Sequence, residues 1–410
     1  MSGFVLREAN VLDRTGGFEG PLDVRVENGR VTAVGPDLPG DDLPSHDFSG
    51  LWLLPGIFDC HDHVASSTVD IAELLGTPVT AWALEAARNL RVTLEAGVTF
   101  VRDLAGADRG IREAVDRGHV PGPKLQVSVV LVCQTGGHGD AYLSGAGLEG
   151  ELTPEYPGRP PFRVDGPESM RHAVRAILRA GADWIKLATT GGLVSEHDQP
   201  LVPELSPGEI SVAVFEAERK GKHVAAHAYG GEGLTNAILG GVRSIEHGGF
   251  LTEAQAALMA ERGCFLVPTL SAMRDCLRWA NEGALTPTQC RKILDLGLDP
   301  GACVRMAKEY GVPLASGTDY ISRTQHGGNL EELALMREAG LTPEETLLVA
   351  TAGGAELCGV ADEYGRIEHG YVFDAVVLDE DPGDLSNLAV GGVFQAGRAA
   401  VPHERVAVPA

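Results

Sequence analysis

The chain has 410 residues, and its 57 Asp and Glu residues outnumber 33 Lys and Arg residues, which gives a formal net charge of -24. Apolar residues at 44% and charged residues at 22% are typical of a globular protein and exclude a disordered or fibrous chain. The acidic balance argues against a nucleic-acid partner, because phosphates attract a basic surface. No stretch approaches the roughly 18 consecutive apolar residues of a membrane-spanning helix, so we expect no membrane contact.

Two further features concern where the protein works. Residues 1–8 contain no basic segment followed by a long apolar run, so we expect no secretory signal there. The seven cysteines form no Cys-x-x-Cys pair, which is typical of reduced thiols rather than of a disulfide framework. We therefore predict a cytoplasmic protein that acts on a small molecule, and we expect it to be a homo-oligomer.

Short strands are predicted near both ends of the chain. They cover residues 4–12, 22–26, 30–34, 372–378 and 393–396. Asn28-Gly29, between two of them, is a strong signal for a two-residue hairpin. Because neither end has enough strands to close a core alone, we predict that residues 1–54 and 362–410 meet in one small β-sandwich domain.

The centre of the chain alternates short apolar runs with helical patterns. The predicted strands cover residues 57–59, 98–103, 124–133, 184–188, 223–227, 244–247, 265–270 and 313–319. The helical patterns between them include residues 82–96, 167–180, 207–220, 252–262 and 289–310. Because parallel strands need crossover connections, this alternation predicts an α/β fold, a (β/α)8 TIM barrel at residues 55–361. Residues 134–166, rich in Gly and Pro, hold no clear strand and are predicted to form a long loop over one barrel face.

Two histidines follow the first of these central strands. His61 and His63 stand in Asp-Cys-His-Asp-His, and alternate residues of a strand point to the same face, so both imidazoles can reach one metal ion. The alternative is a surface turn with two unrelated histidines. The preceding Pro55-Gly56 marks a sharp entry into the strand and favours the metal.

Lys186 lies inside the apolar run Trp-Ile-Lys-Leu-Ala. A lysine in a strand that is buried on both faces costs free energy unless it is paired or neutralised. It can reach solvent at a barrel end, with its stem buried and its ammonium outside. The alternative is covalent: a neutral amine and carbon dioxide give a carbamate, an anionic ligand with two oxygens that can bridge two metals.

Polar side chains also end three other predicted strands. His227, His247 and Asp319 each stand at the carboxyl end of a strand, the face where barrels of this kind place their active sites. One such histidine alone could be a satisfied core residue, but two on successive strands favour a metal site. An unpaired buried carboxylate is costly, so we expect Asp319 to bind metal or to hold a proton.

Together these segments resemble the amidohydrolase superfamily. The matching pieces are Pro55 to His63, Lys186, His227, His247, Ser316 to Asp319, and Gly365 to Gly370 leading into residues 373–378. Within the superfamily the chain looks most similar to Xaa-Pro-type dipeptidases and N-acyl-amino-acid hydrolases. The segments that carry this closer likeness are Thr135 to Gly139, His227 to Gly230 and His326 to Asn329.

The resemblance implies two divalent ions. One would be bound by His61, His63 and Asp319 and the other by His227 and His247, with N-carboxylysine at Lys186 and a hydroxide between them. Zinc suits imidazole and carboxylate ligands, although other divalent metals are compatible. Two such ions lower the pKa of bound water from 15.7 to about 7 and polarise the scissile carbonyl. Asp319 would accept the proton of the attacking hydroxide and deliver it to the leaving amine.

Substrate recognition is predicted from residues near these ligands. His138, in the long loop, is a second catalytic candidate: as a neutral donor it could stabilise the substrate carbonyl or bind a terminal carboxylate, or it only caps a turn. Tyr229 shares the direction of His227 and either binds substrate or packs. His326 follows the last strand and can line the pocket. The candidates for binding a substrate carboxylate are Arg159, Arg274 and Arg323.

We therefore predict a binuclear metal-dependent amidohydrolase that cleaves an amide bond of a dipeptide or of an N-acyl amino acid with a free carboxylate. One alternative is a cyclic-amide or lactam hydrolase resembling imidazolonepropionase. Lys186 counts against it, because that branch typically uses one metal without a bridging lysine. The other alternative is a catalytically silent relative that keeps only the fold, and the presence of all six ligand candidates counts against it.

Overall fold

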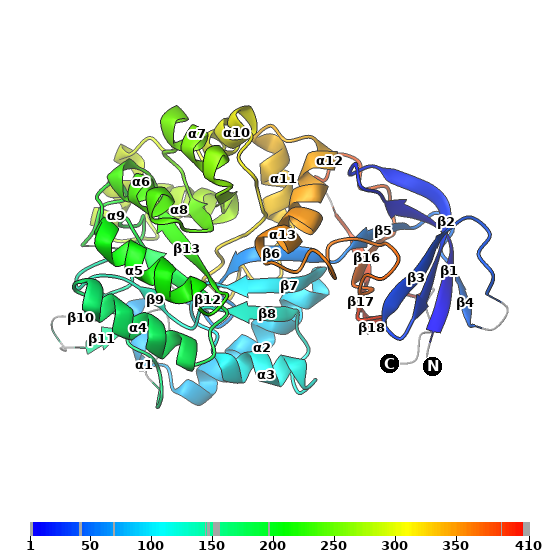
Figure 1. The fold of residues 1–410 in the computed structure, drawn as a ribbon, viewed down its shortest axis with the longest axis horizontal. Helices are drawn as coiled ribbons and strands as arrows, with labels where there is room; N and C mark the ends of the chain where they lie inside the picture. The colour runs from blue at the N-terminus through cyan, green and yellow to red at the C-terminus, as the bar shows by residue number, and fades with distance from the viewer. Residues whose placement is uncertain are drawn as a thin grey trace.

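The computed structural model describes residues 3–404 apart from residues 41–42, 69, 144, 146–147, 151–155, 196 and 387. Strands from both ends of the chain lie at the right of the view in Figure 1, and the helices and strands of the central part lie at the left. Among the described residues, no helix is both long and apolar enough to cross a lipid bilayer.

The strands of the two chain ends form one sheet, the terminal sheet, in the order β18-β17-β16-β5-β1-β2-β3, with β4 paired to β1. These strands are β1 (Gly3–Leu12), β2 (Phe18–Glu27), β3 (Arg30–Gly35), β4 (Ser45–Asp47), β5 (Trp52–Pro55), β16 (Ala375–Leu378), β17 (Val390–Gln395) and β18 (Arg398–Val401). The antiparallel pairing of Val376 with Leu54 joins the two ends, which confirms that they meet. Asn28 and Gly29 both have positive φ between β2 and β3, as the predicted hairpin requires.

The central strands form two parallel sheets that follow chain order. The first contains β6 (Ile57–Asp62), β7 (Val98–Asp103) and β8 (Lys124–Val127); the second contains β9 (Leu131–Val132), β12 (Trp184–Ala188), β13 (His223–Ala228), β14 (Ser244–His247) and β15 (Phe265–Val267). Backbone hydrogen bonds connect these sheets directly, since the amide of Asp183 donates to the carbonyl of Val127 at 2.7 Å. All residues of β6, β7 and β12 to β15 are buried apart from His223, so their polar side chains lie inside the protein.

Three predicted strands differ from those observed. Residues 124–133 form two strands, β8 and β9, because Val129 adopts a left-handed φ of 71° between them. The strand predicted at 265–270 ends at Val267, where a helix soon begins. Residues 313–319 form no regular strand, although the amide of Leu266 donates to the carbonyl of Pro313 at 2.9 Å and the amide of Cys60 to that of Ser316 at 2.8 Å. This segment therefore lies between β15 and β6.

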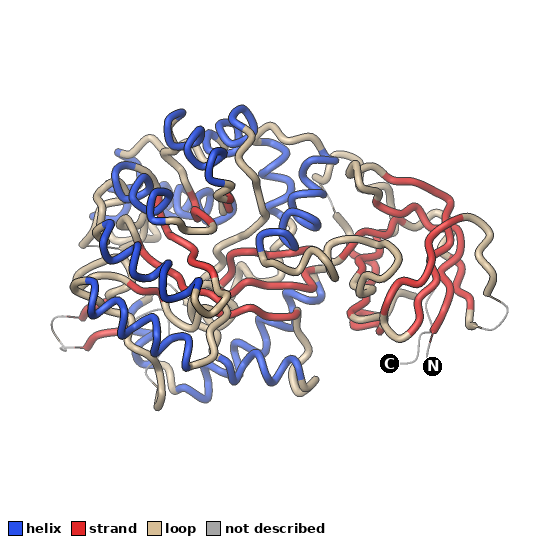
Figure 2. The backbone as a smooth tube through the Cα atoms, viewed as in Figure 1, coloured by secondary structure: helices blue, strands red, loops and turns tan. Residues whose placement is uncertain are grey.

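Helices surround the central strands (Figure 2). They are α1 (Ile71–Gly76), α2 (Val79–Glu95), α3 (Arg109–Asp116), α4 (Pro167–Arg179), α5 (Pro207–Glu218), α6 (Gly231–Gly240), α7 (Glu253–Arg262), α8 (Leu270–Glu282), α9 (Pro287–Asp295), α10 (Ala302–Tyr310), α11 (Glu331–Glu338), α12 (Pro343–Leu348), a π-helical turn (Val349–Gly353) and α13 (Gly354–Leu357). The single helix predicted at 289–310 is wrong: Gly297, with a φ of 61°, and Pro300 separate α9 from α10. Thr286 caps α9 reciprocally with Gln289, which sets its start at Pro287.

The segment predicted as a long loop, residues 134–166, contains a short hairpin. Its strands are β10 (Ala141–Leu143) and β11 (Leu148–Gly150), paired antiparallel. The prediction that this segment holds no strand is therefore wrong at these residues, while its parts at 144, 146–147 and 151–155 lie outside the described residues. Residues 137–142 line the cavity described next, so this segment does cover one face of the central strands.

Candidate active site

The six ligand candidates line one cavity of about 230 Å³. They are His61, His63, Lys186, His227, His247 and Asp319. The structure thus brings together side chains from β6 and the residue after it, from β12, β13 and β14, and from the extended segment 313–319 after α10. All but Asp319 are buried, and the Asp319 side chain is 19% exposed.

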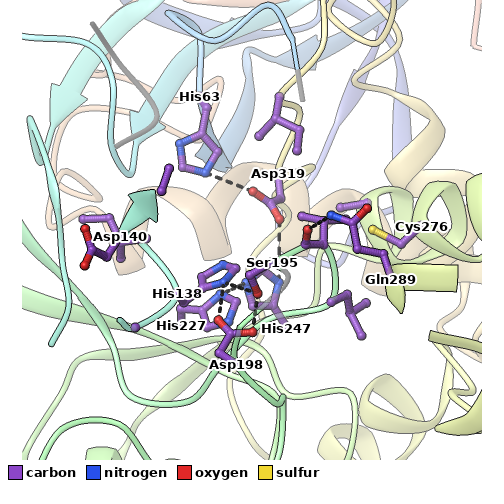
Figure 3. Close-up of a pocket in the computed structure, with 18 of the residues that line it drawn as sticks. His63, His138, Asp140, Ser195, Asp198, His227, His247, Cys276, Gln289 and Asp319 are labelled. Atoms are coloured by element: carbon purple, nitrogen blue, oxygen red, sulfur yellow. Dashed lines mark hydrogen bonds and ion pairs between the residues drawn. The ribbon is translucent and has the colours of Figure 1, made fainter. Parts of the chain in front are cut away.

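Asp319 lies between His63 and His247 (Figure 3). Its Oδ1 is 3.0 Å from Nε2 of His63 and 3.4 Å from Nε2 of His61, and its Oδ2 is 3.9 Å from Nδ1 of His247. One ligand atom each from His61, His247 and Asp319 all lie within 4.8 Å of one another. Two imidazoles and a carboxylate at this separation could hold a divalent ion.

The remaining candidates extend this cluster in two directions. Nζ of Lys186 is 3.3 Å from Nε2 of His61. Nδ1 of His227 is 2.8 Å from Nε2 of His247. The cluster therefore provides imidazole nitrogens, one carboxylate and one amine on the wall of one cavity, with His227 and His247 at the carboxyl ends of β13 and β14.

Burial controls the charge of these groups. It lowers the pKa of His61 and His227 well below the ordinary value and that of His247 to about 3, and it lowers the pKa of Lys186 to about 8. For His63, burial is outweighed by the Asp319 carboxylate, and its pKa is raised. Three neutral imidazoles with available lone pairs are the donor chemistry that zinc and similar ions prefer, so the residues present fit a metal site.

A second partner orients each ring. Nδ1 of His61 is 2.9 Å from Oε2 of Glu246, and Nδ1 of His63 is 2.8 Å from the carbonyl oxygen of Ala105. Nδ1 of His247 is 2.7 Å from Oγ1 of Thr269. Such contacts fix the rotation of an imidazole, which leaves its other nitrogen directed at the cluster.

Glu246 belongs to a buried ion pair that sequence reasoning missed. Nη2 of Arg102 donates to both carboxylate oxygens of Glu246, at 2.9 and 3.1 Å, and both side chains are fully buried. The guanidinium also lies over the Trp184 ring, 4.5 Å from its centroid. The sequence does contain a pattern that indicates this pair, because Arg102 and Glu246 are charged residues inside apolar strands, as Lys186 is.

Three residues of the site adopt left-handed backbone conformations. The φ angle is 75° at His247, 51° at Thr269 and 56° at Asp319. Residues other than glycine seldom adopt these angles. Each of the three stands where a strand or extended segment turns away from the sheet. The side chains of His247 and Asp319 line the cavity, whereas the buried Thr269 hydroxyl contacts Nδ1 of His247.

His138 and Tyr229 join this site as predicted neighbours. The His138 ring stacks on His227, with centroids 4.1 Å apart and planes at 23°. Tyr229 is 4% exposed and stacks on His247 at 4.8 Å and 9°, so its ring packs against a ligand candidate. Nδ1 of His138 faces Ser195 and Asp198, at 3.2 and 3.3 Å.

The other predicted substrate residues lie elsewhere. His326 is not among the described residues that line the cavity; its Nε2 is 3.0 Å from the carbonyl oxygen of Ser66, and its side chain is fully buried. None of the three arginine candidates lines the cavity among the described residues either. Arg274 pairs with Glu331 and Arg323 with Glu85.

One wall of the cavity is apolar and was also missed. Ala272, Cys276 and Trp279 stand three to four residues apart on α8 and present one face of that helix to the cavity. Leu193 and Val194 extend this wall. The sequence analysis predicts a strand up to residue 270, where α8 begins in the structure, and it names no helix over residues 270–282.

Comparisons with known proteins identify the family of this chain. Residues 52–400 match the profile of the Amidohydrolase family. An ochratoxinase from Aspergillus niger is 34% identical over 343 residues, which span 80% of this chain and 70% of that protein. A crystal structure of a prolidase complexed with N-methylphosphonate-L-proline aligns with a TM-score of 0.88 at 32% identity, covering 97% of this chain and 99% of the other.

A third relative is a Xaa-Pro dipeptidase with bound methionine in its active site. Its crystal structure aligns with a TM-score of 0.87 at 27% identity and covers 97% of this chain and 99% of that chain. The family match covers most of the chain, and the alignments with these two crystal structures each span 97% of it. This chain is therefore a member of the amidohydrolase family and a hydrolytic enzyme.

Proposed function

We propose that the protein is a binuclear metal-dependent hydrolase of an amide bond in a dipeptide or an N-acyl amino acid with a free carboxylate. The observation that carries this proposal is the convergence of the six ligand candidates on one cavity. The names of the relatives add support, because a prolidase, a Xaa-Pro dipeptidase and an ochratoxinase stand among them.

The ligand set divides into two groups. His61, His63 and Asp319 would hold one divalent ion, and His227 and His247 the other, with zinc as the preferred metal. Lys186, as N-carboxylysine, would bridge them. The buried amine beside the imidazole of His61 supports this assignment, because an ammonium there has no carboxylate hydrogen-bond partner among the described residues. Bound divalent ions would supply an acidic water and polarise the scissile carbonyl.

Asp319 would carry the proton. Its Oδ1 faces His61 and His63, while its Oδ2 lies 3.9 Å from Nδ1 of His247. Oδ2 is therefore the oxygen that would accept a proton from the attacking water and pass it to the leaving amine. The pKa of Asp319 lies below its usual range, because burial, which raises it, is outweighed by the contacts with His61, His63 and His247, so the carboxylate is ionised and has lone pairs that can accept a proton.

We also propose the architecture that surrounds the site. Residues 55–361 would close into a TIM barrel, and residues 1–54 and 362–410 would form a small β-sandwich domain. The chain-order pairing of the central strands, the backbone bonds between the sheets and the shared terminal sheet support this division. We further propose that the protein is a cytoplasmic homo-oligomer that binds neither nucleic acid nor membrane. Sedimentation of the purified protein would test the oligomeric state.

A substrate library tests the function. The protein is stripped with a chelator, reloaded with zinc, manganese or cobalt, and assayed on dipeptides, N-acyl amino acids and the matching C-terminal carboxamides. We expect hydrolysis only after metal is restored, with carboxylates preferred over their carboxamides. If the reloaded protein binds two ions per chain but hydrolyses none of these amides, the proposal is wrong.

A further inference from the structure

Three residues lie against His138, namely Gly192, Ser195 and Asp198, and Lys292 binds the segment that carries them; we call these four residues the His138 clamp. Nδ1 of His138 is 3.2 Å from Oγ of Ser195 and 3.3 Å from Oδ2 of Asp198. Oγ of Ser195 donates a short hydrogen bond to the other oxygen of Asp198. Ser195 and Asp198 therefore hold one edge of the imidazole together (Figure 3).

Lys292 holds the segment that carries these two side chains. From α9, its Nζ donates to the carbonyl oxygens of Gly192 at 2.8 Å and Ser195 at 2.5 Å, and it lies 3.4 Å from Oδ1 of Asp198. Both Lys292 and Asp198 have side chains that are 6% exposed. A buried ammonium and a buried carboxylate persist only when they satisfy each other and nearby acceptors, so α9 and this segment are firmly connected.

Gly192 lies against the His138 ring. A Cβ atom at residue 192 would lie 2.0 Å from Cε1 of His138, a distance that no side chain can occupy. One face of the imidazole stacks on His227. The backbone amide of His138 donates to the Glu204 carboxylate at 2.9 Å. The Gly192 backbone, the His227 ring and the hydrogen bonds to Ser195, Asp198 and Glu204 therefore confine His138.

The identity of the partners decides which ring nitrogen carries the proton. The pKa of Asp198 lies below its ordinary range, because burial, which raises it, is outweighed by the contacts with His138, Ser195 and Lys292. An ionised carboxylate only accepts hydrogen bonds, so Nδ1 of His138 must donate. Nε2 takes part in no hydrogen bond with the residues that the structure describes, and the ring lines the cavity. The neutral donor predicted for His138 would need the opposite tautomer.

We propose that Asp198 is a positioning residue that acts through His138. With Ser195 and Lys292 it holds the imidazole in one orientation and keeps the proton on Nδ1, so that Nε2 faces the substrate. In its neutral form this ring presents a lone pair to the cavity. The activity measurements below rest on the proposed function, whereas the tautomer measurement does not.

A double-mutant cycle tests the connection. We expect Asp198→Asn to lower kcat/KM by about 10- to 100-fold, because the amide can donate to Nδ1 and reverse the tautomer. In a His138→Ala background the same substitution should lower kcat/KM less than about twofold, since there is no ring left to position. The matched control is Asp183→Asn, a carboxylate paired with Arg112 and Lys222 at the start of β12, which should leave kcat/KM unchanged. Equal losses in both backgrounds would overturn the proposal.

Nitrogen-15 NMR of the labelled imidazoles gives a readout that needs no substrate. The His138 signals, assigned by their loss in His138→Ala, should report a proton on Nδ1 in the wild-type protein and a change of tautomer in Asp198→Asn. A wild-type ring protonated on Nε2 alone would refute the inference. If the NMR result is as expected but no amide is hydrolysed, the proposed function fails and the positioning of His138 stands.

Discussion

The imidazoles on the strands and the imidazole of His138 reach the same cavity, but different neighbours hold them. His61 and His63 stand at the end of β6 and contact fixed groups of neighbouring buried segments, a carboxylate and a backbone carbonyl. His138 stands in a long connection, and Asp198, which contacts its ring, follows 60 residues later. We call the part of the cavity lined by His61, His63, Lys186, His227 and His247 the strand wall, because the central sheets hold it. We call the part formed by His138 and residues 192–198 the loop wall, because Lys292 of α9 binds that loop.

Because different neighbours hold the two walls, we expect substitutions in them to affect different properties, metal content in one case and substrate turnover in the other. The strand wall carries every ligand candidate except Asp319, whose backbone amide in turn donates to the carbonyl of His61. Changes there should alter metal content first. The loop wall carries no ligand candidate, so changes there should alter substrate turnover while metal content stays constant.

Replacing Lys186 should have the largest effect on the strand wall. We expect Lys186→Ala to reduce the metal content from two ions per chain to one and to lower kcat at least about 1000-fold, because metal-ion stabilisation of the transition state is worth several kcal/mol. Elemental analysis and steady-state kinetics measure both. Lys222→Ala, a lysine that pairs with Asp183 outside the cavity, is the control. Two ions bound to Lys186→Ala would contradict the bridge.

Asp319→Asn should have the second-largest effect on catalysis. The amide cannot accept the proton, so we expect kcat to fall about 100- to 10,000-fold while KM changes only a few-fold. Steady-state kinetics on the best substrate of the library separates the two constants. A variant with nearly normal kcat would remove the proton-carrying role from Asp319.

Glu246→Gln tests whether the Glu246 carboxylate, which contacts His61 and Arg102, stabilises the metal site. It should weaken metal binding by about 10- to 100-fold, because His61 loses its anionic partner. Arg102 would also lose its charge partner, which we expect to lower the free energy of unfolding by about 3–5 kcal/mol. Competition with a chromophoric chelator and denaturant unfolding measure these effects. Glu216→Gln, on a carboxylate paired with arginines outside the cavity, should leave metal affinity intact.

Gly192→Ala should have the smallest effect and act on the loop wall alone. Its Cβ would displace the His138 ring, so we expect kcat/KM to fall about 10-fold with both metal ions retained. Gly208→Ala is a matched control, because the atoms nearest to its Cβ are 3.7 Å away. Metal loss in parallel with activity would mean that the two walls are not separable.

The ligand candidates could be found from sequence because each breaks a local pattern. Lys186 interrupts an apolar strand, and His61 and His63 repeat with the period of a strand. Arg102 and Glu246 carry the same signal and could have been found with it. The order of the central strands followed from their alternation with helices in the same way.

The loop wall could not be read from local patterns. Asp198 and Lys292 belong to a polar segment and to the surface pattern of a helix, and only the folded chain brings them to His138. Helix α8 was missed because Phe265 to Leu270 is apolar enough to continue as a strand. The turn at Thr269, with its left-handed φ, ends that strand, and no residue preference predicts it, since glycine or asparagine would be expected there.

The left-handed backbone at His247, Thr269 and Asp319 has a consequence for evolution and engineering. Conformations of this kind cost of order 1–3 kcal/mol each, so these three positions in or next to the site lower the free energy of unfolding of the enzyme. A glycine at residue 269 would relax one of these positions but delete the hydroxyl beside His247. Selection for heat resistance alone should therefore favour such a replacement, and selection for turnover should reject it.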